Sequence, residues 1–172
     1  MTGAAVRRRR LADLPGCERA MLAVHRADGY PAQWPTRPSH FLRPADQLAA
    51  WVAVSGAGEV LGHVALGRDS SAGEQWTGLH GGDGTVAVSR LFVDPAARGQ
   101  GLGERLLAAA VRQVRHWGLV PVLDVVAGST PALHLYRSLG WQELAVVTQE
   151  WSGGVTVPVH CFALNSPADD GR

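Results

Sequence analysis

The stretch Val93-Asp94-Pro95-Ala96-Ala97-Arg98-Gly99-Gln100-Gly101-Leu102-Gly103 decides the fold, because three glycines here join a strand to a helix. The preceding residues, 85–93, are mostly apolar and predict a strand, which Pro95 closes because proline cannot donate to a ladder. Beyond Gly103, apolar residues recur at helical spacing as far as Trp117, and Gly118 predicts the helix end. The pattern is a strand, a glycine-rich turn and an amphipathic helix.

The start of this helix lacks an ordinary cap. The first amide groups of a helix have no internal partners, and a Ser, Thr, Asp or Asn side chain usually binds them. No such residue occurs between Pro95 and Gly103. Open amides, the helix dipole and bare glycines favour an anion such as a pyrophosphate, to which Arg98 would add a guanidinium. The alternative is a flexible glycine turn with a solvated arginine, since glycine motifs this short recur by chance.

Two kinds of phosphate site compete for this run. A dinucleotide fingerprint needs the spacing G-x-G-x-x-G, usually in the first strand-helix-strand unit. Here glycines stand at 99, 101 and 103, after several predicted strands. Asp124 lies 21 residues beyond Gly103, where such a fold places its ribose-binding acid. The glycine spacing nevertheless disfavours a dinucleotide site.

Bulk composition narrows the function further. The chain has 172 residues, of which 46% are hydrophobic, and this predicts one domain over residues 1–165 with a frayed tail at 166–172. The net charge of +1 lacks the basic excess of a nucleic-acid binder, and no segment is apolar for long enough to span a membrane. Lysine is absent, which excludes a pyridoxal Schiff base and the usual NTPase phosphate loop.

The two cysteines, Cys17 and Cys161, lie far apart and without metal-like spacing. They predict free thiols in a reducing compartment, no metal site and a cytoplasmic location. The abundance of Ala, Gly, Pro and Arg suggests a GC-rich bacterial genome.

Hydrophobic periodicity predicts the order β-α-(irregular)-β-β-β-α-β-α-β-β. Four prolines interrupt the segment 29–44, and residues 69–84 form a Gly-rich polar loop. The predicted strands are 6–10, 51–54, 60–66, 85–93, 121–126, 141–150 and 155–164, and the predicted helices are 14–25, 102–117 and 130–139.

Two motifs resemble the Gcn5-related N-acetyltransferase (GNAT) superfamily. Its cofactor motif, [Q/R]-x-x-G-x-[G/A] after a strand that often ends in V-x-P, is similar to Val93–Pro95 followed by Arg98–Gly103. Its later motif, N-x-x-A-x-x-L-Y-x-x-x-G-[F/W], is similar to Ser129–Trp141, with serine in place of asparagine. The resemblance implies an α/β (α+β) fold, with a mixed, mostly antiparallel sheet of about seven strands flanked by about four helices.

The resemblance also implies a cofactor, acetyl-CoA, and residues that bind it. The backbone of Leu91, Phe92 and Val93 would bond the pantetheine arm as an added strand. Ser129 and Tyr136 would complete the site, and Tyr136 would protonate the departing thiolate. Tyr136 also lies on an apolar helical stripe, so a purely structural role is the alternative. The residues implied to hold the pyrophosphate are Arg98, Gly99, Gln100, Gly101, Leu102 and Gly103.

The general base has three candidates. Histone-type members have a glutamate six residues before the strand-ending valine, and that position here is Ala87. In ribosomal-protein alanine acetyltransferases the acid lies twelve residues before the tyrosine, which Asp124 matches. Asp124 is either a base tuned by burial or a structural carboxylate. His63 is the second candidate, and direct attack by a neutral amine with water as proton carrier is the third possibility.

The acceptor would meet the irregular segment after the first helix, which in this superfamily commonly walls the substrate site. Tyr30 and Trp34 offer flat contact area, and Arg37 or Arg43 could hold a carboxylate. The alternative is a proline-stiffened surface loop whose aromatic residues cover the core.

These features predict an acyltransferase that moves an acetyl group to a primary amine of a small molecule or a protein N-terminus, by direct attack in a ternary complex. One alternative is a non-catalytic acyl-CoA sensor, for which the alanine at 87 and the serine at 129 leave room. Another is a nicotinamide oxidoreductase, which NAD rather than acetyl-CoA would stabilise. The last hairpin offers a possible homodimer contact.

Overall fold

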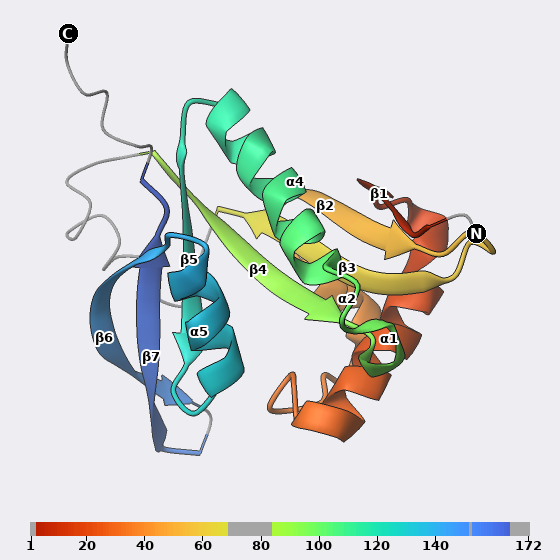
Figure 1. The fold of residues 1–172 in the computed structure, drawn as a ribbon. Coiled ribbons are helices and arrows are strands. Elements are labelled where there is room, and N and C mark those ends of the chain that lie inside the picture. The colour runs from red at the N-terminus through yellow and green to blue at the C-terminus, as the bar shows by residue number, and fades with distance from the viewer. Residues whose placement is uncertain (1–2, 69–83, 152, 166–172) are drawn as a thin grey trace, which may run out of the picture. The chain divides into compact units, whose positions relative to one another are not determined.

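A computed structural model describes residues 3–68, 84–151 and 153–165. Seven strands form a sheet in the order β1-β2-β3-β4-β5-β7-β6, and four α-helices accompany them in this part of the chain (Figure 1). The residues group into two compact units. One comprises Met1–Gly67 and Val88–Gln113, and the other comprises Arg68–Ala87 and Val114–Arg172.

The first unit is built on antiparallel pairs. Strand β1 (Ala5–Arg8) pairs with β2 (Gln47–Val54), and β2 pairs with β3 (Val60–Gly67). Most of β4 (Thr85–Val93) follows β3 in the sheet order. The helical elements of this unit are η1 (Leu11–Asp13), α1 (Leu14–Asp28), α2 (Pro38–Leu42), η2 (Pro95–Ala97) and most of α4 (Leu102–His116).

The helices of this unit cover opposite faces of β3. Val52 lies opposite His63 in the ladder and belongs to a buried cluster with residues of α1 and α2. The next residue along β3, Gly62, points the other way, because side chains alternate along a strand. A Cβ on Gly62 would lie 2.9 Å from a methyl carbon of Leu106 in α4. Thus α1 and α2 lie on one face and α4 on the other.

The second unit contains β5 (Val120–Val126), α5 (Thr130–Ser138), β6 (Gln142–Trp151) and β7 (Val155–Ala163). The start of β4 runs parallel to β5, in a register from Thr85–Val120 to Ala87–Val122. Strand β7 is antiparallel to both β5 and β6. Ala87, Val122, Cys161 and Ala163 form a buried cluster between these strands.

The predicted fold class is confirmed, and Thr85–Val93 has the predicted bounds. Several bounds were wrong, since β2 begins at Gln47 rather than at residue 51 and α1 continues to Asp28 rather than ending at residue 25. The first strand ends at Arg8 rather than at residue 10, and Trp117 lies beyond the end of α4 with 38% of its surface exposed. Trp117 leaves the apolar stripe because the chain turns at Gly118, where φ is 72°. The loop predicted at 69–84, apart from Gly84, and the tail 166–172 lie outside the described residues.

No helix in the described part of the chain combines the length and the apolar character needed to cross a membrane. Cys17 and Cys161 are both buried and unbridged. Burial raises the pKa of Cys17 to about 12 and that of Cys161 to about 11, so both remain thiols at neutral pH.

Candidate active site

The glycine turn before α4 depends on left-handed backbone. Gly99 and Gly101 have φ of 77° and 67°, values that residues with a Cβ rarely adopt. A Cβ at either position would meet nothing within 4 Å, so conformation rather than space requires glycine. Gly103 lies inside the helix, and a Cβ there would make only ordinary contact, at 3.7 Å from Val93.

The turn leaves a set of amides open. Asp94 caps the short helix η2, accepting a bond from the amide of Ala96 at 2.9 Å. The carbonyl of Gly101 accepts the first bond of α4, from the amide of Arg105 at 3.1 Å. Within the described residues, none of the intervening amides, from Gly99 to Glu104, donates to a protein acceptor. Such a group at a helix start fits an anion.

The side chain of Arg98 is already engaged. Its guanidinium forms an exposed ion pair with Asp28, the last residue of α1, in which Nη1 lies 3.3 Å from Oδ1. This bond holds the pKa of Arg98 above its usual value. Arg98, the cation predicted to meet a pyrophosphate, therefore already has a carboxylate partner. That partner, Asp28, immediately precedes the segment predicted to line the acceptor site.

The end of β4 is closely fitted to β3. The amide of Asp94 donates to the carbonyl of Leu61 at 2.8 Å. A Cβ on Gly62 would lie 2.9 Å from the carbonyl oxygen of Phe92 and 3.4 Å from a methyl carbon of Val93. Glycine thus permits the two backbones to approach where the pantetheine strand, Leu91–Val93, is predicted.

His63 is fully buried, with both ring nitrogens bonded. Nε2 lies 2.9 Å from Nη1 of Arg9, and Nδ1 lies 2.9 Å from the carbonyl oxygen of Arg90. Arginine can only donate, so Nε2 is the acceptor and Nδ1 carries the proton. Burial lowers the pKa of His63 to about 3, and both neighbouring arginines disfavour a positive ring. The ring is neutral and has no free lone pair.

Arg90, which the sequence reading missed, introduces an irregularity into β4. Its φ is 52°, a left-handed value that is rare for a residue with a long side chain. Its Nε donates to the carbonyl of Phe41, at the end of α2, and Nη1 donates to Oγ of Ser89 at 2.9 Å. The guanidinium carbon also lies 4.8 Å from the centre of the Phe41 ring. The sequence did contain one indication of a special role for Arg90, because it is a charged residue within a largely apolar strand.

The predicted acceptor residues separate into two groups. Tyr30 is 36% exposed, and its ring centre lies 6.5 Å from that of Phe92. Trp34 is 37% exposed and packs instead on His25, at 5.4 Å between ring centres. Arg37 is exposed at the N-cap of α2 without a side-chain cap bond. Only Tyr30 therefore contacts a residue of the predicted pantetheine strand.

In the second unit, Tyr136 lies at the end of α5. Gly140, with φ of 83°, lets the chain turn back so that the amide of Trp141 donates to the carbonyl of Tyr136 at 3.0 Å. Tyr136 is only 9% exposed, and its ring centre lies 5.9 Å from that of Trp141 and 6.1 Å from that of Phe162. The turn at Gly140 and the ring of Trp141, both part of the motif, thus help to fix the tyrosine ring.

Asp124 and Ser129 belong to β5 and to the start of α5. Asp124 pairs with Cys161 across the ladder and is partly buried. Burial raises its pKa to about 6, which is the range of a usable general base. Ser129 is exposed at the N-cap of α5, and its hydroxyl makes no cap bond there.

The profile of the acetyltransferase (GNAT) family matches residues 13–141. The chain belongs to the GNAT family.

Two curated GNAT relatives illustrate the similarity. An L-methionine sulfoximine/L-methionine sulfone acetyltransferase of Pseudomonas paraeruginosa is 37% identical over 92 residues, which are 53% of this chain and 49% of that protein. A mycothiol acetyltransferase of Saccharomonospora viridis is 34% identical over 148 residues, which are 79% of this chain and 46% of that protein. The chain thus spans about half the length of these relatives or less.

Solved structures share the GNAT fold over nearly the whole chain. NAA60 of Arabidopsis thaliana in complex with acetyl-CoA has a TM-score of 0.73 at 19% identity, with 94% of this chain and 97% of that chain covered. The ribosomal-protein-S18-alanine N-acetyltransferase of Escherichia coli has a TM-score of 0.69 at 17% identity, with 98% and 99% covered.

Proposed function

We propose that the protein transfers the acetyl group of acetyl-CoA to a primary amine, by direct attack within a ternary complex. The observation that carries this proposal is the row of open amides from Gly99 to Glu104, in a family of acetyltransferases. Amides that point outward at a helix start bind phosphate groups without a dedicated side chain.

The residues of the chain fit the cofactor in two places. The open amides suit the pyrophosphate, and Arg98 lies at the same turn. The backbone of Leu91–Val93 suits the amides of the pantetheine arm, in the manner of an added strand. The register between β4 and β5 stops at Ala87, which is consistent with a role for the later residues of β4 in binding a ligand.

Two side chains of the second unit suit the proton transfers. We assign Asp124 as the base that accepts the proton of the attacking amine, because its raised pKa favours uptake of a proton. Tyr136 would donate its phenolic proton to the departing thiolate sulfur. His63 is not assigned as a base, because Nε2 already accepts from Arg9.

The acceptor would be a primary amine of a small molecule or of a protein N-terminus. Among the similar proteins, one acts on L-methionine sulfoximine and another on ribosomal protein S18 alanine. Tyr30 is the first candidate for an acceptor contact, because it packs on Phe92 and is partly exposed. Trp34 and Arg37 are further candidates, and they follow Tyr30 by four and seven residues in the same segment.

Calorimetry with CoA and thiol release with a panel of amines test this function. The panel would include L-methionine sulfoximine and a peptide that begins with alanine. We expect CoA to bind, and the Tyr136→Phe variant to bind CoA as the wild type does but to release thiol at least about tenfold more slowly. His134→Gln, an exposed change on the same helix, is the control and should act as the wild type.

Each other result has a distinct meaning. A protein that binds CoA but releases no thiol with any amine would be a sensor rather than an enzyme. Stabilisation by NAD and not by CoA would point to an oxidoreductase. Equal rates for the wild type and Tyr136→Phe would remove the tyrosine from the mechanism.

We also propose a cytoplasmic location in a bacterium, where both buried cysteines remain thiols. A homodimer through the hairpin of β6 and β7 is a further proposal. Val146 and Val155, 52% and 57% exposed, would lie in that contact. Sedimentation of the wild type and a Val146→Lys variant would test it.

A further inference from the structure

A chain of hydrogen bonds joins four segments of the first unit that are distant in sequence. It runs from Gln47 to Arg9, then to His63, and then to the backbone of Arg90. The individual distances are 2.7 Å from Arg9 to Gln47, 2.9 Å from Arg9 to His63 and 2.9 Å from His63 to the Arg90 carbonyl. We call Arg9, His63 and Arg90 the clamp.

The two arginines of the clamp hold the end of α2. Arg9 donates to the carbonyl of Leu42 at 2.6 Å, and Arg90 donates to the carbonyl of Phe41. These carbonyls lie at the end of a helix of only five residues, where no further helical N–H group follows to donate to them. A helix this short is unstable alone, and cations at its end offset the dipole.

His63 connects this support to β4. Arg9 fixes the tautomer of the ring, so Nδ1–H must donate to Arg90, the residue with left-handed φ. Its ring is also stacked on Phe92, with 5.3 Å between centres and 21° between planes. A non-glycine residue with positive φ persists only where its surroundings hold it. The bond to His63 and the bonds of the guanidinium supply that restraint.

The position of the clamp suggests its purpose. Arg90 immediately precedes Leu91–Val93, and α2 ends the segment after α1 that carries Tyr30, Trp34 and Arg37. The clamp is thus a direct polar connection between the strand assigned to pantetheine and the segment assigned to the acceptor. Structural support of the core alone would be met by apolar side chains at these positions, without two partly buried arginines and a fully buried histidine.

We propose that Arg9, His63 and Arg90 are positioning residues that couple the two halves of the site, so that CoA bound along Leu91–Val93 orders α2 for the acceptor. This inference rests on the proposed function, because it requires CoA to bind that strand. It gives His63 a role that involves no exchange of protons.

Hydrogen–deuterium exchange with and without CoA tests the coupling directly. The amides of His40, Phe41 and Arg43 are bonded within the turn of α2 and report its opening. In the wild type, saturating CoA should slow exchange of the peptide 38–47 at least about fivefold, the lower range of measured couplings between sites. In His63→Asn and Arg9→Gln, CoA should still bind, but this slowing should be lost.

Matched variants separate coupling from damage to the fold. Arg10→Gln makes the same change at the exposed neighbour of Arg9 and should keep the effect of CoA. Arg90→Asn keeps a residue that tolerates positive φ while removing the guanidinium, so it should fold and lose the effect. The proposed coupling would be wrong if CoA still slowed exchange at 38–47 in His63→Asn and Arg90→Asn. It would also be wrong if CoA bound to the wild type without slowing exchange there.

Failure of the function and failure of the clamp give different results. If calorimetry detects no CoA binding to the wild type, the proposed function fails and the coupling fails with it. If CoA binds and thiol release proceeds while exchange at 38–47 does not respond, only the clamp is wrong. The rate–pH profile supplies a second readout, because positioning variants should keep the wild-type midpoints, whereas loss of a base would abolish one.

Discussion

The guanidinium of Arg98 pairs with the carboxylate of Asp28, a residue 70 positions earlier in the chain. This pair gives a carboxylate partner to the cation that is proposed to meet a pyrophosphate. Both side chains are nearly half exposed, at 46% and 43%, so water screens the pair and it contributes little to stability. The pair mainly affects ligand binding, because the pyrophosphate of CoA would compete with Asp28 for the guanidinium of Arg98.

Replacement of Asp28 by Asn should strengthen CoA binding. Removal of the carboxylate releases Arg98 and takes away a like charge near the phosphates, so we expect a dissociation constant lower by about threefold at low salt. Arg98→Gln should raise it by about tenfold, whereas Arg26→Gln, an exposed arginine in the last turn of α1, should change it little. Calorimetry at 20 and 200 mM salt would measure both effects. Weaker binding in Asp28→Asn would show that Asp28 organises the site instead of competing within it.

Gly101→Ala should impair CoA binding although a methyl group has room there. The φ of 67° is the obstacle, and alanine at such a φ costs about 1 kcal/mol. The backbone would relax and turn its amides away, so we expect CoA affinity to fall about tenfold. Gly103→Ala is the matched control, because Gly103 lies within α4 and alanine favours a helix. If both variants bind CoA equally well, the amides of the turn are not the phosphate site.

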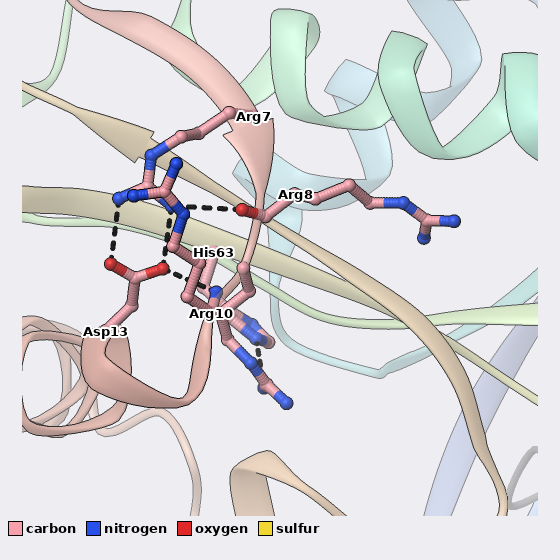
Figure 2. Close-up of polar contacts among 6 residues, drawn as sticks. Arg7, Arg8, Arg10, Asp13 and His63 are labelled. Atoms are coloured by element: carbon pink, nitrogen blue, oxygen red, sulfur yellow. Dashed lines mark hydrogen bonds and ion pairs between the residues drawn. The ribbon is translucent and has the colours of Figure 1, made fainter.

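Asp13 should stabilise the fold at neutral pH and not in acid. Arg7 binds its carboxylate twice, at 2.7 and 2.8 Å, and the amide of Arg10 donates to it at 2.6 Å (Figure 2). The Arg7 bonds hold the pKa of Asp13 below its usual value, so this stabilisation is present above about pH 4 and is lost as the pH falls through the folded-state value. Asp13→Asn should therefore lower the free energy of unfolding by about 2 kcal/mol at pH 7 and hardly change it at pH 2.

Urea unfolding at the two pH values measures this difference. Asp28→Asn is the stability control, since its exposed pair should change the free energy of unfolding by less than about 1 kcal/mol. An equal loss at pH 7 and pH 2 for Asp13→Asn would mean that packing, and not the charge pair, explains the effect.

The sequence predicted the elements whose causes are local. Strand β4 and helix α4 follow from an apolar run, a proline and a helical stripe, and Gly140 marks the return of the chain after α5. The motif residues around Gly101 and Tyr136 were identified for the same reason. Each of these elements and motifs is defined by residues that lie close together in the sequence.

The clamp could not be predicted in this way. Arg9 stood in a run of four arginines with no pattern to distinguish it, and only the positive φ of Arg90 brings its carbonyl to His63. His63 was considered as a base because sequence alone does not reveal what a buried imidazole contacts. The partner of Arg98 was equally hidden, because pairing across 70 residues depends on the fold.

Asp124→Asn should make the protein more stable and less active. Burial raises the pKa of Asp124 to about 6, above the ordinary value of about 4, so the folded state is destabilised as the pH rises from about 4 to 6. Asparagine has no charge to bury, and we expect a gain of about 2 kcal/mol at pH 7.5 that disappears below pH 4. The rate should fall at least about a hundredfold, because asparagine cannot accept a proton. The wild-type kcat/KM should fall at acidic pH with a midpoint near pH 6, and the variant should lack this fall. Thermal melts between pH 4 and 9 would measure the change in stability, and rates over the same range would measure the pH profile.

Glu143→Gln, a change at a carboxylate paired with Arg137, is the control and should keep the acidic fall in kcat/KM. An acidic fall that survives in Asp124→Asn would exclude the Asp124 carboxylate as the base and favour proton transfer to water.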